Sequence, residues 1–293
     1  MAPSYIDLYE GRMSLGRFDL PDEVSVKGEP YRLVRAVKRG GNGVVFEARR
    51  INRYGGGATS CAVKFLRQQN DVRMDRFANE VRVLGGLAHE RIARLYDNGG
   101  VELVGGFKVP WMAMELGGEN LRNHVRDRGP LERATLIRVA TQVCDGLDHV
   151  HERGIIHRDL KPENIVWDPF QRDSIKMIDF GIAKRVGEDT SGRPLDQFTR
   201  EEEFVGPAFF ASPELIAYGD DKSHAVDHRS DLFQFGRMLW FLATGRVSGG
   251  IPSARERPSL AAVRDLVMEL LPDDPAERLE NAATLKERLR SLT

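Results

Sequence analysis

Cysteines and long apolar runs are scarce in this sequence of 293 residues. The two cysteines, Cys61 and Cys144, lie in apolar stretches and lack metal-type spacing, so we expect core thiols in a reducing compartment. The first 20 residues carry charges where a secretory signal is apolar, and no run reaches the roughly 18 apolar residues that span a membrane. These absences predict a cytoplasmic protein.

An excess of charge of one sign is also absent. The 43 basic residues are balanced by 44 acidic ones, which leaves a formal net charge of −1, and the longest block of like charge is Glu201-Glu202-Glu203. We therefore expect neither a nucleic acid nor a membrane as a partner. An apolar content of 41% with 30% charged residues is typical of a soluble globular protein, and the length allows one large domain or two lobes.

Residues 1–30 are polar with weak periodicity, and we expect an N-terminal extension rather than a core element. Whether it packs on the domain or stays mobile is open at this point. From residue 31 the pattern predicts a small antiparallel sheet that packs against one helix. The expected strands are 31–37, 44–48, 60–65, 92–96 and 111–116, and the helix carries Met74, Phe77, Val81 and Leu84 at three- and four-residue steps.

After Gly117-Gly118 the periodicity becomes helical. The fold class is therefore α+β, with an N-terminal lobe over about 31–116 and a larger, mostly α-helical lobe over about 117–293. The predicted helical stripes are Leu136, Val139, Val143, Leu147 and Val150; Leu232, Phe235, Leu239 and Leu242; Val263, Leu266, Val267 and Leu270; and Leu285, Leu289 and Leu292.

A glycine cluster, Gly40-Gly41-Asn42-Gly43, lies between the first two expected strands. Glycine backbone can approach a phosphate closely and point N–H groups at it. A plain hairpin turn explains such a cluster equally well, so this motif is weak by itself.

Lys64 ends an apolar strand, and Glu80 lies on the helix stripe that should face the sheet. Because a carboxylate on an inward face needs a cation, we expect the two to pair, which would aim the lysine at a nucleotide phosphate. The alternatives are a surface lysine and a glutamate at the edge of the helix in water.

The strongest motifs are the segment 156–164 and Asp179, which follows the short apolar run 175–178. Asp159 and Asn164 lie five residues apart in one loop, so three oxygen-bearing side chains can converge. Asn164 and Asp179 suit a hard cation such as Mg²⁺. Asp159 would accept the proton of an attacking hydroxyl, and Lys161 would balance charge on a transferring phosphoryl group.

From about Tyr31 to its end, the order of these motifs resembles the eukaryotic-type (Hanks-type) protein kinases, and the roles that follow are those of the general protein kinase template. The resemblance implies a bilobal fold and transfer of the γ-phosphoryl group of ATP, with Mg²⁺ or Mn²⁺, to hydroxyls of protein substrates. Lys161, two residues after Asp159, resembles the serine/threonine-directed members. The glycine-loop pattern looks bacterial.

The resemblance also implies a role for each site residue. Lys64, Glu80, Asp159 and Lys161 would be catalytic, Asn164 and Asp179 would hold the metal, and Asp231, Glu214 and Arg278 would support the structure. Leu84, Leu95, His157 and Phe180 resemble the stacked hydrophobic residues of the active state. The nucleotide would contact Val37, Gly40, Gly41, Gly43, Val45, Ala62, Lys64, Met114, Glu115, Leu116 and Val166.

Four departures from the family pattern concern the glycine loop, substrate geometry, regulation and docking. Lys38 replaces the first loop glycine, and Pro207 replaces a threonine whose hydroxyl would contact the catalytic loop. We hypothesise that Glu203 offers Arg158 a permanent charge in place of a loop phosphate, although an acidic solvated loop is the alternative. The segment 245–259 is short, which puts docking there in doubt.

A conventional phosphorylation switch is the better account of regulation if Glu203→Ala leaves activity unchanged while Thr190→Ala or Thr199→Ala abolishes it.

Two other functions stay open at this point. A pseudokinase scaffold would bind ATP and act through partners, but such proteins usually lack one of Lys64, Asp159 or Asp179. A small-molecule phosphotransferase of the kinase-like fold would lack Pro213-Glu214, which is present here. A homodimer for autophosphorylation also stays open.

Overall fold

The structure is a computed structural model that describes residues 4–26, 29–40, 43–51, 57–185, 209–220, 226–247 and 260–292. The chain forms two compact units. Unit 1 comprises Met1–Ala88 with Ala93–Gly117, and unit 2 comprises His89–Ile92 with Gly118–Thr293.

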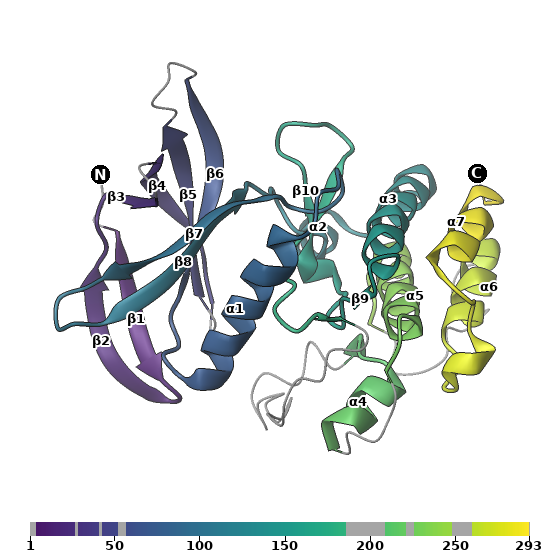
Figure 1. The fold of residues 1–293 in the computed structure, drawn as a ribbon. Helices are drawn as coiled ribbons and strands as arrows, with labels where there is room; N and C mark the ends of the chain where they lie inside the picture. The colour runs from purple at the N-terminus through teal and green to yellow at the C-terminus, as the bar shows by residue number, and fades with distance from the viewer. Residues whose placement is uncertain are drawn as a thin grey trace. The chain divides into compact units, whose positions relative to one another are not determined.

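Unit 1 is built on a six-stranded sheet in the order β3-β4-β5-β6-β8-β7, and all its strand pairs are antiparallel (Figure 1). One helix, α1, accompanies the sheet, which confirms the predicted sheet with one helix. The strands are β3 (Glu23–Val26), β4 (Glu29–Arg39), β5 (Gly43–Ile51), β6 (Ala58–Leu66), β7 (Leu95–Glu102) and β8 (Lys108–Glu115), and α1 spans Asp71–Gly85.

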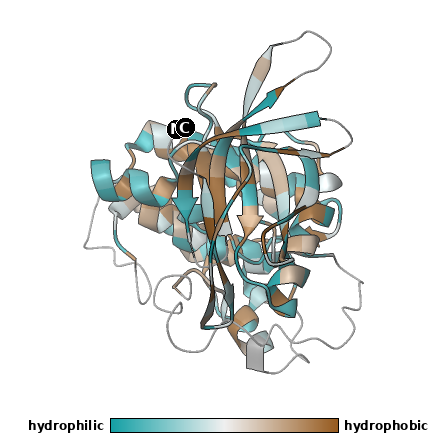
Figure 2. Cartoon of the chain, turned by 90° about the vertical axis from the view of Figure 1, so that its left-hand side faces the viewer, coloured by the Kyte–Doolittle hydropathy of each residue, from teal (hydrophilic) through white to brown (hydrophobic). Residues whose placement is uncertain are grey.

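Alternating burial along the strands produces the core of unit 1. On β5 the side chains of Val44, Phe46 and Ala48 are buried at every second position, which is the period of a strand with one face inward. The rings of Phe46 and Phe65, on neighbouring strands, meet edge to face with centroids 5.8 Å apart. Figure 2 shows the apolar colouring concentrated in the central strands.

The N-terminal segment differs from our expectation, because it is folded into the core. Strands β1 (Tyr5–Glu10) and β2 (Met13–Asp19) form a hairpin, drawn in purple in Figure 1. Ile6 and Leu8 are fully buried in the same cluster as Trp111. The expectation of no core element was wrong because two alternating apolar residues suffice to anchor a strand among polar neighbours. The start of the catalytic domain at residue 31 stays a prediction.

The strand predicted at 92–96 is displaced, since β7 begins at Leu95 and continues to Glu102. Its sequence Asp-Asn-Gly-Gly has poor strand propensity, which explains the misplacement. Gly99 is required by packing: a Cβ there would lie 2.6 Å from the Val26 side chain and 3.0 Å from that of Trp111.

Unit 2 is mostly helical, which confirms the predicted fold class. The four helical stripes correspond to α3, α5, α6 and α7, whereas α2 and α4 were not predicted. The helices are α2 (Leu121–Arg128), α3 (Arg133–His151), α4 (Pro213–Asp220), α5 (Arg229–Thr244), α6 (Ala261–Leu270) and α7 (Ala282–Arg290), with short 3-10 turns η1 (Pro162–Asn164) and η4 (Pro275–Glu277).

Two small antiparallel pairs of strands frame the loops between α3 and α4. They are β10 (Ile165–Trp167) with β11 (Ile175–Met177), and β9 (Ile155–Ile156) with β12 (Lys184–Arg185). The run predicted at 175–178 is therefore a strand that ends just before Asp179.

Both cysteines are free and buried, as predicted. Burial raises the pKa of Cys61 to about 11 and that of Cys144 to about 12, so both thiols stay protonated near neutral pH. Among the described residues, no helix has the length and apolar character needed to cross a membrane.

Candidate active site

Lys64 and Glu80 form the predicted ion pair in unit 1. The Nζ atom of Lys64, on β6, lies 2.7 Å from Oε2 of Glu80, on α1. The Glu80 side chain is only 4% exposed and that of Lys64 16%, so the pair is held in a poorly solvated place. The α1 helix sets this geometry: Asn70 caps its first turn by accepting a hydrogen bond from Arg73 N at 3.0 Å, and its buried face carries Glu80 among apolar residues.

The glycine-rich connection joins β4 to β5. The Gly40 N–H donates to the Gly43 carbonyl at 3.0 Å, which closes the turn. A Cβ at Gly43 would lie 2.7 Å from the Phe65 carbonyl oxygen, so only glycine fits there. Lys38, which replaces the first loop glycine, pairs opposite Val45 within the sheet.

Four of the residues predicted to contact the nucleotide gather in a small apolar cluster of unit 1 that is separate from its main core. The cluster also contains Phe77, which lies on α1 with Glu80, and Met112, which pairs opposite Lys64 in the sheet, so it borders the Lys64–Glu80 pair. The four are Val45, Ala62, Met114 and Leu116.

The other predicted contacts lie elsewhere. Val37 is 42% exposed on β4, and Glu115 accepts a hydrogen bond from Arg94 N at 3.2 Å. Val166 is buried on β10 of unit 2. Their contact with a nucleotide stays a prediction.

The loop that contains Asp159 is tightly organised in unit 2. Nζ of Lys161 lies 2.8 and 2.7 Å from the two carboxylate oxygens of Asp159. Nδ2 of Asn164 donates to the Asp159 carbonyl at 2.8 Å and to its Oδ2 at 3.0 Å. Burial lowers the pKa of Lys161, but the charge and hydrogen bonding of Asp159, together with the charges of Asp179 and Glu163, outweigh burial and raise the net pKa, so the lysine stays cationic.

Asp179 lies on a second segment that is joined to this loop. The Ile178 N–H donates to the Asn164 carbonyl at 2.9 Å, which ties the end of β11 to η1. Asp179 has a φ of 65°, in the left-handed region that non-glycine residues rarely adopt. Such strain at a polar residue is a feature of functional sites and supports a special role for Asp179.

These residues fit a magnesium ion by their chemistry. Both side-chain hydrogen bonds of Asn164 use its nitrogen Nδ2, so its amide oxygen Oδ1 is not engaged in them. An amide oxygen and the Asp179 carboxylate are hard donors of the kind Mg²⁺ prefers, with the remaining ligands normally coming from phosphate and water. No cluster of three His, Cys, Asp or Glu residues suited to a metal occurs in the part of the chain that the structure describes.

Asp231 supports the loop from α5. Its carboxylate is fully buried and accepts hydrogen bonds from the backbone N–H groups of His157 and Arg158, both at 2.8 Å. Nε2 of His151 lies 2.8 Å from Oδ2. Burial by itself would raise the pKa of Asp231, but the hydrogen bond with His151 helps to hold the pKa below its usual value. The anion fixes Arg158, whose φ is 65°.

Gln234 is a supporting residue that our sequence reading missed. Its Oε1 accepts from Leu160 N at 2.7 Å and its Nε2 donates to the Arg158 carbonyl at 2.8 Å. The available signal was a polar residue inside an apolar helical stripe, three residues after Asp231 and thus on the same face.

The predicted pair of Glu214 and Arg278 also forms. The guanidinium donates to both carboxylate oxygens at 2.7 and 2.8 Å, and the Arg278 side chain is fully buried. This bidentate pair joins the start of α4 to the segment after η4.

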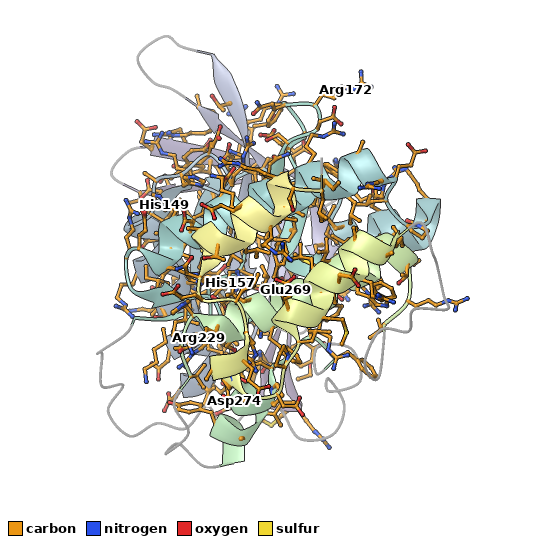
Figure 3. The ribbon with its side chains drawn as sticks, turned by 90° about the vertical axis from the view of Figure 1, so that its right-hand side faces the viewer. His149, His157, Arg172, Arg229, Glu269 and Asp274 are labelled. Atoms are coloured by element: carbon orange, nitrogen blue, oxygen red, sulfur yellow. The ribbon has the colours of Figure 1, made fainter. Side chains whose placement is uncertain are left out.

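Within unit 2 the rings of His157, labelled in Figure 3, and Phe180 lie 4.5 Å apart. Leu84 and Leu95 belong to unit 1, so the stack of all four residues stays a prediction.

Several predicted residues lie outside the described residues: Gly41, Thr190, Thr199, Glu203 and Pro207, together with most of the segment 245–259. Arg158 itself is described: its side chain is buried, its guanidinium lies 5.1 Å from the centre of the Tyr218 ring, and burial lowers its pKa. The proposed link between Arg158 and Glu203 stays a prediction.

If the chain carries out the phosphoryl transfer that its motifs imply, replacing Glu80 by glutamine should lower the rate about tenfold, because the buried ion pair with Lys64 becomes a weaker hydrogen bond from the lysine cation to a neutral amide. Steady-state kinetics of the purified variant measure the effect. Glu47→Gln is the matched control, since Glu47 pairs with the 69% exposed Arg35 on the same sheet. Equal rates for Glu80→Gln and the wild type would contradict a role for this pair.

The comparisons with known proteins agree with this geometry. A family model described as the protein kinase domain matches residues 31–289. A probable serine/threonine-protein kinase of Corynebacterium efficiens is 32% identical over 260 residues, which cover 87% of this chain and 36% of that protein. Serine/threonine-protein kinase pkn3 of Myxococcus xanthus is 30% identical over 287 residues, covering 89% of this chain and 50% of that protein.

A third relative, serine/threonine-protein kinase PknB of Mycobacterium leprae, is 32% identical over 248 residues, which cover 77% of this chain and 37% of that protein. The chain thus spans between 36 and 50% of the length of these three relatives. The resemblance seen in the motifs is confirmed over most of the chain, and the chain belongs to the protein kinase family.

Proposed function

We propose that this chain transfers the γ-phosphoryl group of ATP to serine or threonine hydroxyls of protein substrates, its own hydroxyls included. The observation that carries the proposal is the loop in which Asp159, Lys161 and Asn164 are hydrogen-bonded to one another. The names of the three relatives, all serine/threonine-protein kinases, support the choice of acceptor.

Each residue has a role that follows from its chemistry. Asp159 orients the acceptor hydroxyl and accepts its proton, and Lys161, which stays cationic beside it, neutralises charge on the phosphoryl group. Lys64, oriented by Glu80, contacts nucleotide phosphates. Asn164 and Asp179 would hold Mg²⁺ or Mn²⁺, which supplies charge stabilisation when bound.

A pseudokinase scaffold is the runner-up, and the side-chain geometry argues against it. Lys64, Asp159 and Asp179 are all present, and the first two are held in charge-assisted hydrogen bonds. A protein that only binds ATP has no need to orient a proton acceptor. Lys38 and Pro207 are the two departures that would favour the scaffold.

Incubation with labelled ATP and Mg²⁺, followed by phosphoamino-acid analysis, tests the proposal. We expect phosphoserine or phosphothreonine on the chain or on an added protein, and none after chelation of the metal. Nucleotide binding without any transfer would favour the pseudokinase, and absence of nucleotide binding would overturn both. The dependence of the autophosphorylation rate on protein concentration shows whether a homodimer takes part.

For the location of the protein we propose the cytoplasm, on the strength of its two free, buried thiols. Recovery of the protein with membranes after cell fractionation would contradict this.

A further inference from the structure

Arg67 connects the glycine-rich connection to the N-terminal hairpin, defined as strands β1 and β2. Its Nη1 donates to the Gly40 carbonyl at 2.9 Å and its Nε donates to the Asp7 carbonyl at 3.0 Å. Its Nη2 also lies 3.6 Å from the Asp7 carboxylate. The side chain is only 13% exposed, so a single, poorly solvated guanidinium bonds to both segments.

Arg39 makes a second connection between the same two segments. It is the last residue of β4 and directly precedes Gly40. Its Nη1 donates to the Tyr5 carbonyl at 3.0 Å, and its guanidinium lies 3.9 Å from the centre of the Tyr5 ring. The hairpin is therefore linked to two consecutive residues at the start of the connection. It accepts a hydrogen bond from Arg39 directly, and it is linked to Gly40 through Arg67.

The hairpin also contacts the residues that lead into α1. The Tyr9 N–H donates to the Arg67 carbonyl at 3.0 Å, and the Gln69 N–H donates to the Tyr9 carbonyl at 2.8 Å. The next residue, Asn70, is the cap of α1, which carries Glu80. One strand of the hairpin thus borders both the glycine connection and the start of the helix that orients Lys64.

We infer that the N-terminal hairpin is a positioning element for the nucleotide-binding connection, with Arg67 as the positioning residue. Glycine backbone loses much conformational freedom when it is ordered, and this cost reduces ligand affinity if it is met on binding. A charge-assisted hydrogen bond that already fixes the Gly40 carbonyl lowers that cost before ATP arrives. The inference rests on the proposed function only for the identity of the ligand.

The test replaces Arg67 by methionine, which keeps the apolar stem and removes every donor. We expect the dissociation constant of a non-hydrolysable ATP analogue and the KM for ATP to rise roughly tenfold, the size of one such hydrogen bond, while kcat changes less than about twofold. Arg67→Lys keeps the charge but cannot donate to both carbonyls, so an intermediate rise is expected. Tyr5→Leu, which removes the ring beneath Arg39, should act in the same direction.

Arg35→Met is the matched control, because Arg35 lies on the same sheet and pairs only at the surface with Glu47. It should leave both constants unchanged. A purely structural role for Arg67 would instead lower the thermal midpoint and kcat and raise the KM for every substrate. That result would overturn the inference, as would unchanged ATP affinity.

Amide hydrogen exchange in the nucleotide-free protein separates this inference from the proposed function. In Arg67→Met the peptide that contains Gly40 and Gly43 should exchange at least several times faster than in the wild type, whatever ligand the protein binds. Unchanged exchange would overturn the inference even if the protein is an active kinase. A wild type that neither binds ATP nor transfers phosphate would overturn the proposed function, and the exchange rates would still decide on the hairpin.

Discussion

Replacing Asp159 by asparagine should lower turnover about 10³-fold, within the range that general base catalysis contributes. Asparagine has the shape of aspartate but cannot accept a proton from the attacking hydroxyl. It also removes the anion that binds Lys161 through both oxygens, while the backbone bond from Asn164 to the residue 159 carbonyl is retained. Single-turnover measurements of phosphate transfer to a protein substrate determine the loss.

The affinity for ATP should change little in this variant, because the nucleotide contacts that we propose lie on other residues. Asp173→Asn is a suitable control: the Asp173 side chain is about half exposed in the same unit, and among the described residues its carboxylate pairs with surface arginines. If Asp159→Asn retains a tenth or more of the wild-type rate, Asp159 is not the proton acceptor.

Replacing Arg278 by methionine should lower the free energy of unfolding by roughly 3–5 kcal/mol, because it leaves the carboxylate of Glu214 buried without its cation. The Arg278 guanidinium also donates to the carbonyls of Pro272, Arg229 and Asp273, so five hydrogen bonds to described residues are lost with it. Arg229 is labelled in Figure 3. Denaturant titration followed by circular dichroism measures the change.

Arg288→Ala is the matched control for this variant. Arg288 of α7 pairs with Glu269 of α6, labelled in Figure 3, but is 49% exposed, so its removal should leave the free energy of unfolding nearly unchanged. The double variant Arg278→Met with Glu214→Leu should recover a large part of the lost stability, because no buried charge remains unpaired. Equal losses for Arg278→Met and Arg288→Ala would show that burial does not govern the strength of these pairs.

Local sequence was sufficient to predict the pair of Lys64 and Glu80, whereas the pair of Glu214 and Arg278 was implied by the family resemblance. Glu80 on an apolar helix stripe has few ways to avoid an unpaired buried charge, and Lys64 at the end of an apolar strand was the available cation. Helices α3, α5, α6 and α7 could also be predicted from the sequence, since their apolar residues recur with the helical period.

Features that depend on partners distant in the chain could not be predicted from the sequence. In the sequence, Gln234 looks like an ordinary polar residue. Its supporting role follows from its place on α5, where its side chain bonds to the backbone of Leu160 and Arg158. The short strands around Ile6 and Leu8 carry too few apolar residues to indicate a core element, and their burial follows only from docking on the sheet.

By itself, the sequence determined the family, the division into a sheet-rich and a mostly helical part, and the identity of the groups that can carry the chemistry, because periodicity and charge act over a few residues. Tertiary structure alone decided which polar atoms meet. It placed the fully buried Asp231 carboxylate under two backbone N–H groups, and it set Arg67 between Gly40 and the hairpin. Hydrogen bonds require atoms to lie within about 3 Å, and no local pattern specifies such distances between segments far apart in the chain.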